Sequence, residues 1–200
     1  SVEDVRGVRC VAVVAVCGLG CHGVRSFLTF LVYQTRTTCA SEKCESLKDY
    51  VALAEQYARD VVAGTIPAAK WTRLACERSI KDAKRKKWRY AFDAAAANRV
   101  CDILEKFRHI KGEWANRKET LQLEPWQCWI TCQVFGWKNA KGLRRYRTAY
   151  IEVPRKNAKS TFSSALGLYM LTADGEQGAE VYSAAKSRKQ ALIVFEGAQE

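Results

Sequence analysis

The stretch from residue 147 to residue 172 combines a strand pattern, a short polar loop and a helical pattern, and this order restricts the fold more than any other feature of the chain. Residues 147–153 have the β-branched and aromatic content of a strand, which Pro154 ends. After the loop, apolar side chains recur at helical spacing. They are Phe162, Ala165, Leu166, Leu168, Tyr169 and Leu171.

The same alternation continues toward residue 200. Asp174-Gly175 predicts a turn, residues 178–185 predict a second strand, and residues 186–200 predict a further helix. Strand, loop, helix, strand and helix in this order are typical of the opening of a parallel α/β sheet. We therefore expect an α/β fold in this part of the chain.

The loop from Val153 to Thr161 retains half of a phosphate-binding (Walker A) motif. That motif has Gly, four residues, and then Gly-Lys-Ser/Thr; Val153 and Ala158 stand at the glycine positions, whereas Lys159 and Ser160 keep theirs. In such loops backbone N–H groups surround the phosphates, the lysine bridges the outer phosphates, and the hydroxyl holds Mg²⁺. A small Ala158 still allows close approach, but a β-branched Val153 resists positive φ. By itself the pattern leaves open an ordinary lysine-rich turn.

The chain is basic, with a formal net charge of +12 and a pI near 9.4. Residues 1–46 hold five Lys/Arg and four Asp/Glu, a net charge of +1, so the remaining 154 residues carry +11. The dense basic runs are residues 81–90 and 138–147, where aromatic residues alternate with cations. Such runs suit phosphate contacts and base stacking, and they equally suit a solvated helix face and a solvated loop.

Residues 1–46 form a cysteine-rich, apolar extension whose role stays open. The alternatives include a secretory signal and an upstream translation that does not belong to the functional domain. Its apolar runs are shorter than the ~18 residues that span a bilayer. Five of the nine cysteines lie there, and a loose zinc-like spacing comprises Cys17, Cys21, His22, Cys39 and Cys44. We favour thiols over a metal site. The other cysteines, which are Cys76, Cys101, Cys128 and Cys132, have the setting of small buried hydrophobes in a reducing compartment.

Residues 47–112 have the pattern of a helical region. Apolar side chains recur at helical spacing over three stretches. The stretches are residues 47–62, 68–87 and 92–107. Gly64 with Pro67 ends the first helix, and Lys111-Gly112 ends the region.

A tryptophan and a glutamine precede the loop by about thirty residues. They belong to Leu123-Glu124-Pro125-Trp126-Gln127, where Pro125 suits the first turn of a helix. A glutamine can present a donor and an acceptor to the edge of adenine, while a nearby aromatic ring stacks on its face. The alternative, and the simpler interpretation of this segment alone, is an amphipathic helix with Trp126, Ile130 and Val134 in the core.

Together these motifs resemble the large terminase subunit of tailed bacteriophages, over roughly residues 47–200. The segments that carry the resemblance are residues 57–62, 111–115, 123–127, 154–161 and 182–185. It implies the ATPase part of a motor that packages viral double-stranded DNA into an empty capsid, with ATP and Mg²⁺ as cofactors. It also implies a portal protein and a small terminase subunit as partners, a homo-oligomer, no membrane association, and a place in the host-cell cytoplasm at the procapsid.

The resemblance further implies roles for individual residues. Lys159 would contact the outer phosphates, and Ser160, or Thr161 after it, would serve Mg²⁺. Gln127 would read adenine with Trp126 as the stacking ring, and Arg155 would sense or stabilise the γ-phosphate; a salt bridge or a solvated arginine is its alternative. The positions expected to surround the phosphates are Lys156, Asn157, Ala158, Lys159, Ser160 and Thr161.

We therefore expect an extension over residues 1–46, a helical region over residues 47–112, and the truncated start of a parallel sheet of the P-loop NTPase type over residues 113–200. No apolar strand ending in Asp-Glu, which would hold Mg²⁺ and orient the attacking water, occurs between Lys159 and Glu200. The expectation is weak nucleotide binding without ATP hydrolysis by these residues alone. Another DNA-translocating P-loop ATPase, and a basic helical nucleic-acid-binding module without a nucleotide site, stay open as alternatives.

Overall fold

The computed structural model describes residues 48–110, 112–154, 157–176 and 178–199, which form mainly helices. The predictions for residues 1–46, including the zinc-like cysteine spacing, lie outside these ranges. The described elements are α1 (Tyr50–Ala63), α2 (Lys70–Ala83), β1 (Tyr90–Phe92), α3 (Ala94–Lys106), α4 (Gly112–Asn116), α5 (Pro125–Gly136), β2 (Trp137–Asn139), α6 (Lys159–Thr172) and α7 (Arg188–Gln199). None of these helices is long and apolar enough to cross a membrane.

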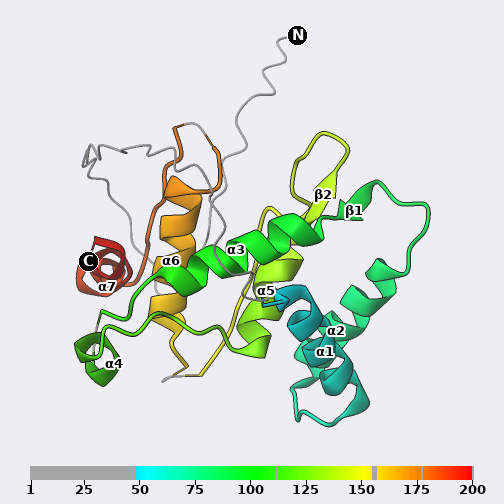
Figure 1. Cartoon of the computed structure of the whole chain (residues 1–200), viewed down its shortest axis with the longest axis horizontal. Coiled ribbons are helices and arrows are strands. Elements are labelled where there is room, and N and C mark those ends of the chain that lie inside the picture. The colour runs from blue at the N-terminus through cyan, green and yellow to red at the C-terminus, as the bar shows by residue number, and fades with distance from the viewer. Residues whose placement is uncertain (1–47, 111, 155–156, 177, 200) are drawn as a thin grey trace, which may run out of the picture.

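Helices α3 and α5 pack against each other in the middle of the molecule, as Figure 1 shows. Helix α1 packs on α5 and also on α2, so that α1 and α2 form one end. Helix α6 contacts α3 and carries α7 at the other end. The helix that begins at Lys159 therefore packs on the central pair, as α1 does.

The predicted helices are confirmed, and their ends follow local capping chemistry. Asp49 precedes α1, and its Oδ1 accepts a hydrogen bond from the N–H of Ala52 at 3.1 Å. Gly64 ends α1 in the left-handed conformation, with φ at 85°. Pro125 occupies the first turn of α5, as the sequence predicts.

The main core lies between α1, α3, α5 and α6. Its buried side chains include Tyr50, Leu104, Phe135, Phe162 and Tyr169. A smaller cluster of Ala58, Val61 and Cys76 joins α1 to α2, and Trp129 packs against both clusters. None of the residues of α7 is buried, and Phe195 is 45% exposed.

The parallel sheet expected in the second half of the chain is absent from the described residues. Neither residues 147–153 nor residues 178–185 form a strand, although both segments run without helical structure. A strand is stable only when a neighbouring strand takes its N–H and C=O groups, and neither segment has such a neighbour in the described ranges. Their aromatic residues consequently remain exposed, with Tyr150 at 74% and Tyr182 at 72%.

The one sheet among the described residues is the antiparallel pair of β1 and β2. Tyr90 lies opposite Asn139, and Phe92 lies opposite Trp137. Phe92 therefore belongs to a strand, whereas its hydrophobic spacing predicts the start of a helix. The helix starts two residues later because Asp93 caps it, its Oδ1 accepting from the N–H of Ala96 at 2.9 Å.

Candidate nucleotide-binding site

The loop before α6 turns into the helix through a left-handed residue. Ala158 has φ 48° and ψ 23°, and Lys159 is the first residue of α6. Ala158 stands where the phosphate-binding motif has its second glycine, the residue type that adopts this conformation without a steric penalty. The backbone therefore takes the glycine conformation although the glycine is missing.

The Lys159 side chain folds back across the loop. Its Nζ donates a hydrogen bond to the carbonyl oxygen of Val153 at 3.2 Å, and Asn157 Nδ2 donates to the carbonyl of Pro154 at 3.3 Å. The loop thus brings the ammonium close to its own beginning. Arg155 and Lys156, two further predicted site residues, lie outside the described residues.

Ser160 and Thr161 occupy the first turn of α6, where backbone N–H groups lack intrahelical acceptors and the helix dipole is positive. Both residues line a small cavity with His109, Ile110 and Gly197, among others, whose volume is about 70 Å³. Pockets for nucleotide-sized ligands typically exceed about 300 Å³. The cavity is too small for a nucleotide, so the phosphates would have to bind on the open side of the loop.

Helix α5 places the predicted adenine-reading residues near the start of α6. The ring of Trp126 lies 6.0 Å from that of Phe162 in an edge-on contact. Gln127 is 5% exposed, and its Oε1 accepts the N–H of Glu124 at 2.9 Å as part of the cap of α5. Since an amide oxygen has two lone pairs and the NH₂ group two hydrogens, this bond leaves hydrogen-bonding capacity for a base.

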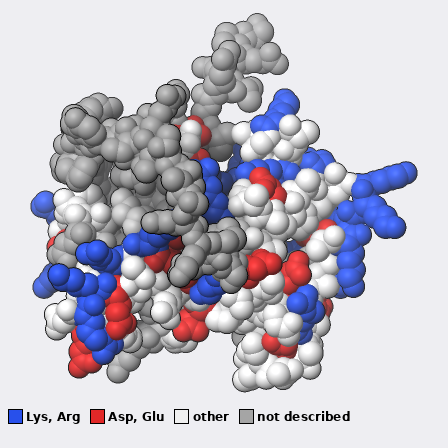
Figure 2. All heavy atoms as spheres, viewed as in Figure 1, with Lys and Arg blue, Asp and Glu red and all other residues white. Residues whose placement is uncertain are grey.

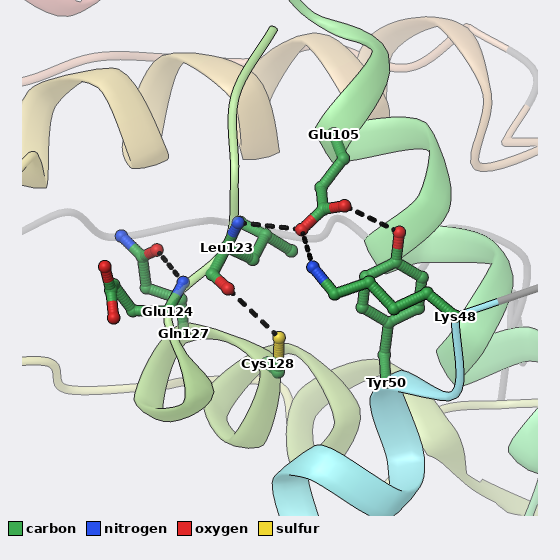
Figure 3. A network of polar contacts seen from close by, with 7 residues as sticks. All are labelled: Lys48, Tyr50, Glu105, Leu123, Glu124, Gln127 and Cys128. Atoms are coloured by element: carbon green, nitrogen blue, oxygen red, sulfur yellow. Dashed lines mark hydrogen bonds and ion pairs between the residues drawn. The ribbon is translucent and has the colours of Figure 1, made fainter.

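A glutamate in α3, which the sequence patterns do not single out, holds the segment that leads into α5 (Figure 3). Glu105 Oε1 accepts from Lys48 Nζ at 2.7 Å and from the Leu123 N–H at 2.8 Å, while Oε2 accepts from the Tyr50 hydroxyl at 2.8 Å. Burial, together with this hydrogen bond, raises the pKa of Tyr50 well above its usual range. Glu105 thereby fixes Leu123 next to the Glu124–Gln127 cap.

The sequence carries one faint signal for Glu105. It lies four residues after Cys101 and directly after Leu104, both fully buried, at the edge of the apolar stripe of α3. A carboxylate beside an apolar stripe needs partners, but the partners come from residues 48, 50 and 123, which the sequence does not show to be near.

A comparison with protein families assigns the second part of the chain. Residues 125–200 match the family model described as the terminase large subunit, ATPase domain. The match covers 76 of the 200 residues, and over this part the chain is similar to that family. The matched segment begins at Pro125, the first residue of α5, and therefore includes Trp126, Gln127 and the whole loop before α6. No curated protein and no solved structure matches the chain.

The terminase ATPase family implies the use of a nucleotide, usually with Mg²⁺. Ser160, which follows the lysine of the motif, is the residue expected to serve that ion. Within the described ranges, no group of His, Cys, Asp or Glu side chains is arranged to hold a metal ion by itself. A magnesium ion would therefore have to be held largely by phosphate oxygens and water, with a hydroxyl from the start of α6.

Proposed function

We propose that the loop of residues 153–161 binds the phosphates of ATP in a DNA-packaging motor of the terminase type, which couples ATP hydrolysis to DNA translocation. Lys159 contacts the outer phosphates, and Ser160 or Thr161 supplies the hydroxyl for Mg²⁺. Backbone N–H groups of residues 156–161 surround the phosphates. Arg155 acts on the γ-phosphate, an assignment that rests on the resemblance alone.

The observation that carries this proposal is the position of the Lys159 ammonium. Its Nζ lies 3.2 Å from the Val153 carbonyl oxygen, at the mouth of the loop and beside the amino end of α6. A phosphate oxygen is a stronger acceptor for an ammonium than a neutral carbonyl. Phosphates bound there would replace the carbonyl as the partner of Lys159, and the positive helix end would add to the attraction.

The proximity of α5 supports adenine as the base. Trp126 packs against Phe162, three residues beyond Lys159, so the Trp126-Gln127 pair lies near the amino end of α6. In this proposal the amide of Gln127 pairs with the adenine edge while its carbonyl oxygen keeps the Glu124 N–H. Trp126 offers an aromatic face for stacking.

The proposal extends to the assembly in which the motor acts. Residues 47–112 serve as a helical support for an ATPase region that starts near residue 113. Double-stranded DNA, a portal protein and a small terminase subunit are the partners, in a homo-oligomer at the procapsid within the host cytoplasm. The basic charge of the chain supports the DNA partner, because counterion release favours polycations on phosphates.

Binding of a fluorescent ATP analogue with Mg²⁺ tests the nucleotide site. We expect Lys159→Ala to weaken binding by about 10- to 100-fold, since a charge-assisted hydrogen bond contributes about 1.5–3 kcal/mol. Ser160→Ala combined with Thr161→Val should make the affinity independent of Mg²⁺.

Lys70→Ala is the matched control, because Lys70 is likewise the first residue of a helix that follows a loop. It should bind the analogue like the unaltered chain. Equal affinities of the Lys159→Ala variant and the unaltered chain would refute the proposed site.

A further inference from the structure

Two stretches that overlap the basic runs, residues 83–92 and residues 137–151, form one structural unit although 44 residues separate them. Each contains five Lys or Arg and no Asp or Glu. The pairing of β1 with β2 places Tyr90 opposite Asn139 and thus joins the end of the first run to the start of the second. Ten of the chain's cations are therefore gathered around one short sheet.

A buried carboxylate links the two runs. Asp82, at 2% exposure, accepts from Arg145 NH1 at 2.7 Å through Oδ2, and its Oδ1 lies 3.2 Å from Arg85 Nε. The Arg145 guanidinium also lies 4.4 Å from the ring centre of Trp88 and 4.6 Å from that of Tyr146. Arg145 is largely buried by these contacts, so it holds the runs together and is not itself presented to a ligand.

The remaining cations of the two runs divide into paired and unpaired ones. Arg144 pairs with Asp174, and Lys138 pairs with Asp93. Six exposed residues have no carboxylate partner within the described residues, and we call them the basic surface. They are Lys84, Lys86, Lys87, Arg89, Lys141 and Arg147. Figure 2 shows Lys and Arg atoms crowded along the connection between α2 and β1 and at the tip of the loop after β2, whereas near α4 basic and acidic atoms intermingle.

The aromatic residues of these runs are already engaged within the protein. Trp88 contacts Tyr90 and Trp137 edge-on, at 5.4 and 5.2 Å between ring centres. Arg85 and Arg89 lie over Trp88 and Tyr90 at 4.9 Å. Rings held in this way are not available as stacking platforms for bases, which proteins that bind single strands need.

We propose that the basic surface binds the phosphate backbone of double-stranded DNA and does not read its bases. The inference rests on the proposed function for the identity of the polyanion, and it adds the face of the molecule that meets it. Six separate cations without carboxylate partners suit a duplex, whose phosphates carry one charge per about 1.7 Å of its axis. An acidic protein is the competing partner, and the experiment distinguishes it.

The test measures duplex binding without nucleotide as a function of salt concentration. Affinity falls with salt, and each lost phosphate contact makes the slope of log K against log salt less steep by about 0.9. A variant with Gln at residues 84, 86, 87 and 89 should therefore have a slope that is less steep by up to about 4. The double variant Lys141→Gln with Arg147→Gln should have a slope that is less steep by about 2. Two unrelated duplex sequences should bind equally, and single strands of the same length more weakly.

The control substitutes Gln for four exposed cations outside the surface, which are Lys70, Arg73, Lys106 and Lys118. It removes the same charge and should leave the slope nearly unchanged. An equal loss of slope in the control, tighter binding of single strands, or equally tight binding of poly-glutamate would overturn the proposal.

The nucleotide site is tested separately. Lys159→Ala should leave the salt slope of duplex binding intact, and the variants of the basic surface should bind the ATP analogue normally. If the chain does not bind the ATP analogue while the variants of the basic surface change the salt slope as expected, only the proposed nucleotide site is contradicted.

Discussion

Ala158 is, together with Lys118, one of two non-glycine residues with a positive φ in the described chain. Its φ of 48° lies in the left-handed region, which disfavours a residue with a Cβ by about 1–2 kcal/mol. Glycine adopts this conformation freely but has more conformational entropy in the unfolded chain, which offsets part of the gain. We expect Ala158→Gly to raise the free energy of unfolding by up to about 1 kcal/mol, measured by urea denaturation.

Ala52→Gly is the matched control for this substitution. Ala52 is exposed and lies in α1 with ordinary helical backbone, where glycine costs about 1 kcal/mol. The two Ala-to-Gly changes should therefore shift the urea midpoint in opposite directions. A loss of stability in both would show that the left-handed turn before α6 is not populated in solution.

At the scale of elements, one carboxylate joins the start of α1, the end of α3 and the segment before α5. Removing it by Glu105→Ala leaves the Tyr50 hydroxyl and the Leu123 N–H without their acceptor, and each unsatisfied buried group costs about 1–3 kcal/mol. We expect a loss of at least about 2 kcal/mol in the free energy of unfolding. Hydrogen exchange at the Leu123 amide should become faster as well.

Glu55→Ala serves as the comparison. Glu55 pairs with Arg59 on the exposed face of α1 at 3.4 Å, and such pairs contribute less than about 1 kcal/mol. If both glutamate variants lose the same stability, Glu105 is only another surface charge.

At the scale of the whole molecule, the core connects elements that are far apart in the sequence. Cys101, Cys128 and Cys132 lie in the main core, and Cys76 lies in the smaller cluster. All four are free and buried, and burial raises the pKa of Cys76 to about 11. All four thiols are shielded from solvent, and the Cys76 thiol is protonated at pH 8, so they should react only when the structure opens.

Alkylation at pH 8, followed by mass spectrometry of the separate peptides, measures this opening. We expect the peptides of Cys76, Cys101, Cys128 and Cys132 to be modified at one common rate, which rises with urea as the whole chain unfolds. Early modification of Cys76 alone would mean that α1 and α2 open independently of the main core, although Trp129 packs against both clusters.

The sequence alone determined the helices, several of their ends, and the order of loop and helix around Lys159. These features depend on contacts between near neighbours along the chain, such as the cap from Asp49 to Ala52 and the left-handed Gly64, and local spacing encodes them directly. The pattern also predicted a helix directly after the loop, and α6 begins at Lys159.

Only the tertiary structure decided which of these pieces meet. Strand content at residues 147–153 could not reveal that no described neighbour pairs with them, because a strand depends on partners distant in sequence. The use of Glu105 to hold Leu123, and of Asp82 to join two basic runs, has the same origin. Each of these contacts spans from 18 to 63 residues, a separation at which spacing in the sequence carries no signal and packing alone selects the partner.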